Sequence, residues 1–278
     1  MTRPTVWYRF LNPLQPVRDL WSHRELLAQV VRREIEARYR GSYLGLFWSL
    51  ITPLVMLATY TFVFSVIFQS RWRADAVPAR GEFALTLFAG LIAFNVFTEV
   101  VTRAPTLVIS NANYVKNVVF PIQILPVSAL GAALFHGAVN LAILMAASLV
   151  VFGTISHTIW LLPLATLPLL GLCLGIGWFL ASLGIFVRDT TYAVGMAVQI
   201  LFFLTPVIYP SSAVPEPLRG WLVLNPLATV VEGFRRTLVW SQHPDWAAWS
   251  FAMGTAAAVF VLGYAWFMIT RSGFADVL

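Results

Sequence analysis

Charged residues are scarce in this sequence. They make up 11% of its 278 residues, whereas a soluble domain carries about 25%, so a soluble globular protein is excluded. Hydrophobic residues make up 59% of the chain, and several apolar runs exceed the roughly 20 residues with which a helix crosses the hydrocarbon core of a bilayer. A β-barrel is excluded as well, because its strands would show short alternating segments. The sequence therefore predicts an all-α polytopic membrane protein.

Cysteine and lysine each occur only once, as Cys173 and Lys116. A single cysteine excludes an intrachain disulfide. The phosphate-binding loop of ATPases needs Gly-Lys followed by Ser or Thr, but Lys116 stands between Val115 and Asn117. We therefore expect this chain to hold no cofactor of its own. If ATP drives transport, ATP and Mg belong to a partner subunit.

Motifs for catalysis or metal binding are also missing. The four histidines have no metal-ligand spacing to one another, and no GxSxG motif occurs. We predict no catalytic residue, no metal site and no enzymatic activity in this chain. Nucleic acid is a poor partner for a protein this apolar, although its net charge is +6.

Six apolar runs predict six membrane spans. No core of a cleavable signal peptide is visible in residues 1–41, so we expect the first span to direct insertion. Residues 1–47 would form an N-terminal cytoplasmic segment and residues 48–278 one transmembrane domain. The predicted spans are Trp48–Phe68, Phe83–Val101, Val127–Phe152, Ile159–Val187, Tyr192–Tyr209 and Ala247–Thr270.

A helix is expected over residues 22–40, after an irregular stretch at residues 1–19 that contains three prolines. Ser22 followed by Glu25 fits a capping box at the start of this helix. Charged pairs in the favourable i, i+4 order would stabilise it. These pairs are Glu34–Arg38 and Glu36–Arg40.

The same helix is amphipathic. Leu27, Val31 and Ile35 recur every four residues and form an apolar stripe, while the remaining face is basic. Such a helix is suited to lying on the membrane surface. Gly41 and Gly45 would then let the chain turn into the bilayer.

Basic residues concentrate in the segments that would share one side of the membrane. The N-terminal segment, the loops after the second and fourth spans, and the tail hold 12 of the 18 basic residues, and the three opposite loops hold 6. The positive-inside rule places both termini in the cytoplasm. The loop after the fifth span then faces the exterior.

This outer loop contains an apolar run, Trp221–Val231, that is far too short to cross a bilayer. Pro215 and Pro217 precede this run, and Pro226 interrupts it. Proline-broken backbone lies at membrane depth only where protein or water satisfies its polar groups. Two alternatives remain open: the segment at about 211–240 dips back into the helices, or it rests on the outer surface.

Polar residues inside the spans are few and mostly neutral. Glu99 is the one acidic or basic residue within them, which argues against a proton-coupled transporter. Asn95 lies four residues before Glu99, and His136 four residues before Asn140, so each pair shares a helix face. These groups, together with Gln199, either hold the helices together by hydrogen bonds or line a hydrated path for a polar cargo.

Aromatic residues form a second stripe in the first span. Tyr60, Phe64 and Phe68 follow one another once per turn. Sugar rings pack their apolar faces on aromatic rings, so the stripe suits a sliding sugar chain. The alternative is ordinary packing together with the interfacial aromatic belt.

The loop at residues 102–126, after the second span, is polar and is interrupted by three prolines. A short helix near residues 104–110 would lie in the cytoplasm, where a peripheral protein can push on it. A plain connection between spans is the alternative.

Several stretches together resemble the permease subunit of type-2 ABC exporters of polysaccharides, which move O-antigen, capsule and teichoic acid chains. The resemblance runs from about residue 20 to the C-terminal end. One departure is Asn111-Ala112, where the family often has Asn-Pro. The matching stretches are RREIEARYRGSYLGLFWSLITPL (32–54), SNANYVKNVVFPIQILP (110–126), FLASLGIFVRDT (179–190), LTPVIYPSSAVPEPLRGWLVLNPLATVVEGFR (204–235) and GYAWFMITRSGFADVL (263–278).

The resemblance implies a homodimer of six-span subunits in the bacterial inner membrane, bound to two copies of a cytoplasmic ABC ATPase, with the channel between the protomers. It implies an interface helix at residues 22–40, a coupling helix near 104–116 and re-entrant outer helices near 214–240. The implied ATPase contacts are Arg24, Arg32, Arg103, Pro105, Asn111, Asn113 and Lys116. The implied substrate path is Trp48, Tyr60, Phe64, Phe68, Asn95, Glu99 and Gln199, and the implied outer gate is Tyr209, Trp221, Asn225, Pro226, Glu232 and Arg235.

The function that the resemblance implies is ATP-driven export of a lipid-linked polysaccharide from the cytoplasm. O-antigen is the first candidate cargo, with capsule or teichoic acid as alternatives. Three rivals are the same architecture exporting a drug or smaller lipid, a membrane-embedded transferase acting on lipid-linked sugars, and a passive channel.

Overall fold

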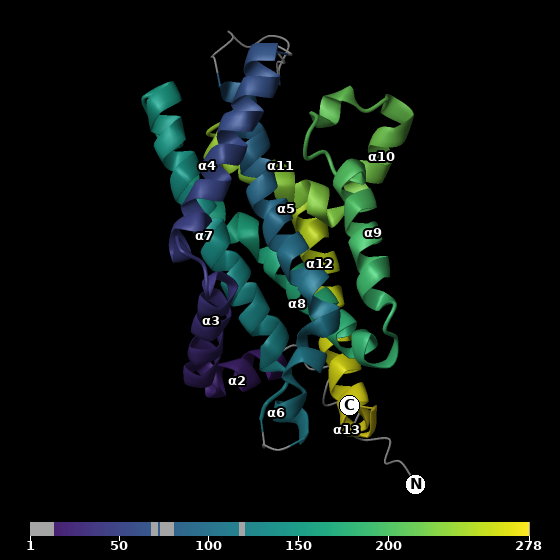
Figure 1. The fold of residues 1–278 in the computed structure, drawn as a ribbon. Helices are drawn as coiled ribbons and strands as arrows, with labels where there is room; N and C mark the ends of the chain where they lie inside the picture. The colour runs from purple at the N-terminus through teal and green to yellow at the C-terminus, as the bar shows by residue number, and fades with distance from the viewer. Residues whose placement is uncertain (1–13, 68–71, 73–80, 117–119, 278) are drawn as a thin grey trace.

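The computed structural model describes residues 14–67, 72, 81–116 and 120–277, and all the regular elements there are helices. Five helical stretches are long and apolar enough to cross a membrane (Figure 1). The first comprises η1 (Gly45–Phe47), α4 (Trp48–Tyr60) and the start of η2 (Thr61–Ile67). The others are α5 (Glu82–Leu107), α7 (Ile124–Phe152), η4 (Ile159–Leu161) with α8 (Leu162–Phe186), and α12 (Trp246–Thr270) with η6 (Arg271–Gly273) and α13 (Phe274–Val277).

The predicted fifth span is shorter than the other five. Helix α9 (Thr190–Leu204) has 15 residues, so it rises about 22 Å, less than the roughly 30 Å of a hydrocarbon core. It ends at Leu204 because Thr205 adopts an extended backbone and Pro206 follows. The count of six spans therefore stays a prediction.

The N-terminal segment holds two helices, α2 (Leu14–Ser22) and α3 (Arg24–Tyr39). The expectation of irregular structure over residues 1–19 is therefore wrong for residues 14–19, and residues 1–13 lie outside the described residues. The predicted capping box is also wrong, because Ser22 ends α2 and His23 precedes α3 without a side-chain cap. The apolar stripe of α3 does pack inward, with Val31 against Gly131 of α7. Gly41 and Gly45 have positive φ angles, as the predicted turn requires.

Helix α5 is longer than predicted at its C-terminal end. It continues past Val101, through Pro105, to Leu107. Proline removes one hydrogen bond within a helix, but here the turn is held by close packing, because the backbone of Pro105 lies against Gly184 of α8. The chain then forms η3 (Ile109–Asn111) and α6 (Ala112–Lys116).

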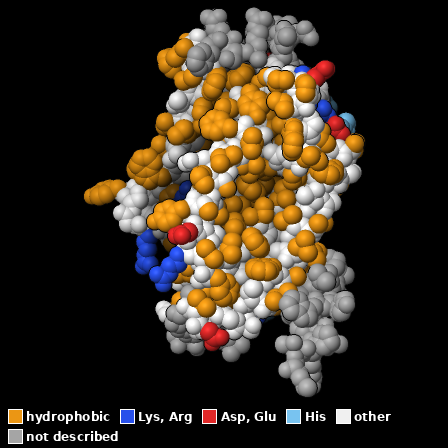
Figure 2. Space-filling view, turned by 90° about the vertical axis from the view of Figure 1, so that its right-hand side faces the viewer, with side chains coloured by type: hydrophobic (Ala, Val, Ile, Leu, Met, Phe, Trp, Pro, Cys, Tyr) orange, Lys and Arg blue, Asp and Glu red, His pale blue; other side chains and the backbone are white. Residues whose placement is uncertain are grey.

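Helix α5 is also the centre of the bundle. In its most apolar stretch 83% of the residues are buried, compared with 6% for Gly45–Phe64. Helices α2, α6 and α13 gather at the lower end of Figure 1, and α10 (Glu216–Leu224) lies at the opposite end. Figure 2 shows apolar side chains covering most of one face, with the visible acidic and basic side chains at its margins, as expected for a surface in lipid.

Helices α8 and α12 approach each other closely along a line of glycines. A Cβ atom added to Gly263 would collide with the backbone of Gly175, and one added to Gly175 would collide with the backbone of Val259. Small residues at such positions allow membrane helices to pack backbone to backbone.

We therefore expect Gly263→Ala to lower the free energy of unfolding by about 1–3 kcal/mol, the usual cost of overpacking. Gly254→Ala is the matched control, since it lies on the same helix and an added Cβ atom there meets nothing within 4 Å. Thermal melting of both variants in lipid nanodiscs checks this. Equal melting temperatures for the two variants would contradict the packing described.

Candidate functional site

A cavity of about 1000 Å³ opens between α3, α4, α5 and α7. It brings together four residues predicted to lie on a substrate path, Trp48 and Tyr60 from α4 and Asn95 and Glu99 from α5. His136 and Asn140 of α7 line the same cavity. The two i, i+4 pairs noted in the sequence therefore face one space.

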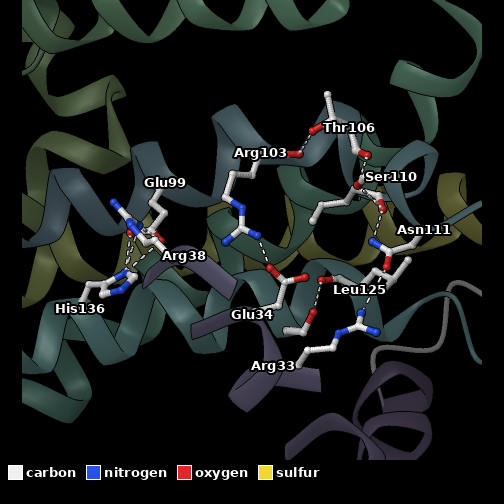
Figure 3. Close-up of polar contacts among 12 residues, drawn as sticks. Arg33, Glu34, Arg38, Glu99, Arg103, Thr106, Ser110, Asn111, Leu125 and His136 are labelled. Atoms are coloured by element: carbon white, nitrogen blue, oxygen red, sulfur yellow. Dashed lines mark hydrogen bonds and ion pairs between the residues drawn. The ribbon is translucent and has the colours of Figure 1, made fainter. Parts of the chain in front are cut away.

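A network of charged groups closes the α3 side of this cavity. Arg38 Nη1 donates to Glu99 Oε1 at 2.6 Å, and His136 Nδ1 lies 3.0 Å from both oxygens of Glu99. Figure 3 shows Arg38 and His136 converging on Glu99, and Arg103 directed at Glu34. The Glu99 side chain is 15% exposed. Its carboxylate is therefore contacted mainly by protein groups, Arg38 of α3 and His136 of α7.

These contacts replace two predicted ones. Glu34 and Arg38 do not pair with each other along α3; each forms an ion pair with α5 instead, Glu34 with Arg103 and Arg38 with Glu99. The ion pair observed within α3 joins Arg32 and Glu36. Helix α3 thus packs against α7 and is joined to α5 by these two ion pairs, and its contact with a membrane surface stays a prediction.

Arg33 connects α3 to the segment after α5. Its Nη2 donates to Asn111 Oδ1 at 3.2 Å, and its Nη1 contacts the hydroxyl of Tyr114. Asn111 in turn donates to the carbonyl of Leu107, in the last turn of α5. Helices α3, α5 and α6 therefore form one connected block at this end.

The predicted ATPase contacts differ in how accessible they are. Arg24 and Arg32 on α3 and Asn113 on α6 are exposed, and Asn111 is half-buried. Arg103 is paired with Glu34, and Pro105 is buried within the bundle. Lys116 ends α6, and its side chain lies outside the described residues. The contact with an ATPase stays a prediction for all seven.

The aromatic stripe is only partly directed at the cavity. Tyr60 lines it, whereas the ring of Phe64 packs against Phe83 with centroids 5.1 Å apart. Phe68 lies outside the described residues. Gln199 is exposed on α9 and does not line this cavity.

A second polar centre lies around Arg235 of α11 (Pro226–Leu238), which is fully buried. Its Nη1 and Nη2 donate to the carbonyls of Pro206 and Val207 at 2.6 and 2.5 Å, and its Nε donates to the carbonyl of Thr86 on α5 at 3.2 Å. The guanidinium carbon lies 4.3 Å from the ring centroid of Trp72. One side chain thus donates hydrogen bonds to the backbone carbonyls of the segment that follows α9.

The other predicted gate residues lie in the segment from the end of α9 to α11. Asn225 caps α11 through Oδ1, which accepts from the Leu227 amide at 3.0 Å, and Pro226 occupies the first turn, so α11 starts as a helix separate from α10. Glu232 lies 3.5 Å from Arg235. The hydroxyl of Tyr209 donates to the Phe203 carbonyl, and Trp221 on α10 is 70% exposed.

Comparison with known proteins decides the family. A profile of the ABC-2 type transporter family matches residues 25–239. The chain belongs to the ABC-2 type transporter family. It is therefore a multi-pass membrane protein and a component of a transporter.

Two relatives of this ABC-2 transporter chain carry the same name. The O-antigen export system permease protein RfbA of Myxococcus xanthus is 28% identical over 231 residues, which cover 82% of this chain and 86% of the relative. The protein of that name from Klebsiella pneumoniae is 25% identical over 256 residues, covering 91% of this chain and 95% of the relative.

Sequence reasoning missed several groups that build the site of this ABC-2 transporter. It assigned no interhelical contact to Arg33, and it paired Glu34 with Arg38 within α3 because their i, i+4 spacing offered a local partner. It did place Glu99 and His136 among the membrane-depth polar groups. Their charge and spacing were the available signal, but which helix supplies each partner depends on packing.

We expect Arg235→Lys to destabilise the protein strongly. A lysine keeps the charge but not the planar fork that reaches several acceptors, and each buried carbonyl left unpaired costs about 1–3 kcal/mol. Arg236→Lys is the control, because the neighbouring Arg236 is half-buried and makes one long bond, 3.4 Å, to the His243 carbonyl. Thermal melting in nanodiscs compares them, and equal stability of the two variants would refute the role assigned to Arg235.

Proposed function

We propose that this chain is the membrane subunit of an ATP-driven exporter that moves a lipid-linked polysaccharide, O-antigen, out of the cytoplasm across the bacterial inner membrane. The observation that carries the proposal is the similarity along nearly the whole chain to proteins named as O-antigen export permeases. A drug or a smaller lipid as cargo has no comparable support.

The cavity beside α5 is consistent with a sugar cargo. Its wall combines aromatic rings, Trp48 and Tyr60, with the amide of Asn95 and the hydroxyl of Thr52. Aromatic rings match the apolar faces of sugars, and amides and hydroxyls replace the water that hydrates their hydroxyl groups. A path of this kind binds weakly at each point, which allows a long chain to slide.

We infer that ATP is hydrolysed on a separate ABC ATPase that contacts α6 and the exposed face of α3. The block formed by Arg33, Asn111 and Tyr114 supports this inference, since a push on α6 reaches α3 directly. A homodimer is supported by the first span, where Leu50, Leu54 and Phe62 are exposed. These apolar side chains suit a second copy of the chain or lipid.

The proposed orientation has both termini in the cytoplasm, because the basic residues lie mainly in the segments on that side. Helices α10 and α11 then lie at the exterior end, with α11 re-entrant. The packing of α11 supports re-entrance over a surface position, since nine of its residues are buried.

The first test is export itself. In a strain deleted for this gene we expect surface O-antigen to disappear, and to return when the chain is supplied together with its ATPase. Immunoblots of extracted lipopolysaccharide measure this. Normal O-antigen in the deletion strain, or restoration by the chain in a strain that lacks the ATPase, would contradict the proposal.

The second test concerns orientation. Cys173 is buried, so a single introduced cysteine reports its own accessibility. With a membrane-impermeant maleimide on whole cells, we expect Glu216→Cys to be labelled at once and Glu25→Cys only after permeabilisation, because both positions are exposed but lie at opposite ends. The reverse pattern would invert the proposed topology.

A further inference from the structure

Three buried polar atoms without hydrogen-bond partners belong to residues that line the cavity between α3, α4, α5 and α7. They are Thr98 Oγ1, His136 Nε2 and Asn140 Oδ1. A buried polar atom without a partner costs about 1–3 kcal/mol. Three of them around one space indicate that the wall is built to be completed by a polar molecule.

His136 supplies an acceptor in this wall. Its Nδ1 lies 3.0 Å from both oxygens of Glu99, and only a protonated Nδ1 donates to a carboxylate. Arg38 Nη1, which can only donate, also lies 3.3 Å from Nδ1. In the neutral tautomer that donates to Glu99, the proton occupies Nδ1 and Nε2 carries a free lone pair. Asn140, one turn further along α7, presents its amide on the same face, and Thr98 adds a hydroxyl from α5.

The balance of charge selects the type of ligand. The cavity wall contains Arg38 and Arg103, and each is paired with a carboxylate, Glu99 or Glu34. The two positive charges are thus balanced by two carboxylates. A phosphate or another anionic ligand would have to compete with those carboxylates for the arginines, so an anion is disfavoured as the ligand. A neutral molecule with many hydroxyl groups uses the unpaired acceptors without disturbing the ion pairs.

The apolar part of the wall agrees with such a ligand. Trp48, which is 44% exposed, and Tyr60 present rings from α4, and Phe88 adds a ring from α5. The exposed amide of Asn95 lies among them. At about 1000 Å³ the cavity is at the upper end of the size of ligand pockets, so it holds several sugar rings.

We propose that this cavity is a saccharide-binding site within a single subunit, which holds neutral sugar residues of the cargo through Thr98, His136 and Asn140. The inference rests on the proposed function, because it takes the sugar from the exported polysaccharide. The three residues that would hold the sugar lie on two helices of the same chain, Thr98 on α5 and His136 and Asn140 on α7. The three atoms are covered in this conformation, so sugar binding shifts the side chains over them.

The experiment measures binding without transport. The full chain in lipid nanodiscs, free of maltoside or glucoside detergent, is titrated by calorimetry with short oligosaccharides, cut by mild acid from the O-antigen of the organism that carries the gene. We expect Thr98→Val and Asn140→Leu each to weaken binding about 3–10-fold, because each removes one hydrogen bond worth about 1 kcal/mol at nearly constant volume.

Matched controls come from the same two helices. Thr86 on α5 and Ser148 on α7 also hold buried hydroxyls without partners, but neither lines the cavity. Thr86→Val and Ser148→Ala should therefore bind within about twofold of the wild type. Elution as a single species confirms that each variant is folded.

The outcomes separate the two proposals. Undetectable binding by the folded wild type, or equal binding by all four variants, would overturn the saccharide site. So would displacement of lipid alone, without oligosaccharide binding, since it would mark the cavity as a place for acyl chains. If the wild type restores surface O-antigen but binds no oligosaccharide, the site is wrong and the proposed function stands. If it binds oligosaccharide but restores none, the proposed function fails instead.

Discussion

The buried guanidinium of Arg235 is the interaction on which the junction of α5, α9 and α11 depends. Within hydrocarbon, backbone that leaves a helix has no water to bond with, and the chain after α9 contains such backbone at Pro206 and Val207. Arg235 supplies the missing donors from α11. It reaches them because residue 90 is glycine, since a Cβ atom there would lie 2.9 Å from Nη2. Arg235 thereby ties α11 to α5 and to the segment that follows α9, while α8 and α12 also pack against α11.

The same constraint explains the charges at the other end. Glu99 and Arg103 lie on a largely buried helix, so each needs an opposite charge from within the protein. Glu34 and Arg38 of α3 supply these charges. Exposed pairs along one helix are worth only about 0.3–0.5 kcal/mol, so the local partners on α3 do not compete. The N-terminal segment is thereby drawn onto the transmembrane bundle as a wall of the cavity.

Sequence patterns predicted what local chemistry controls. Hydropathy located five helices that are long and apolar enough to span a membrane, out of six predicted spans. The prolines after the fifth predicted span marked the region where α10 and α11 begin, because proline geometry is local. The patterns failed where tertiary packing decided. Helix α5 runs through Pro105 because Gly184 leaves room for its backbone, and that contact joins residues far apart in sequence. The spacing of Asn95, Glu99, His136 and Asn140 indicated which side chains line the cavity, but not which helices enclose it.

The distribution of packing shows which wall of the cavity is able to move. Helix α5 makes contacts on opposite sides. Thr86 and Gly90 contact Arg235 of α11. Glu99 and Arg103 contact α3 from positions roughly half a turn further around the axis of α5. It is held on both sides and acts as the fixed wall. Helix α4 is largely exposed, and elements with few buried contacts open at lower free energy. Within one chain, the cavity widens if α4 and α3 move away from α5. The Arg38–Glu99 and Glu34–Arg103 ion pairs oppose that movement of α3, so under the proposed function they are the contacts on which a push on α6 would act.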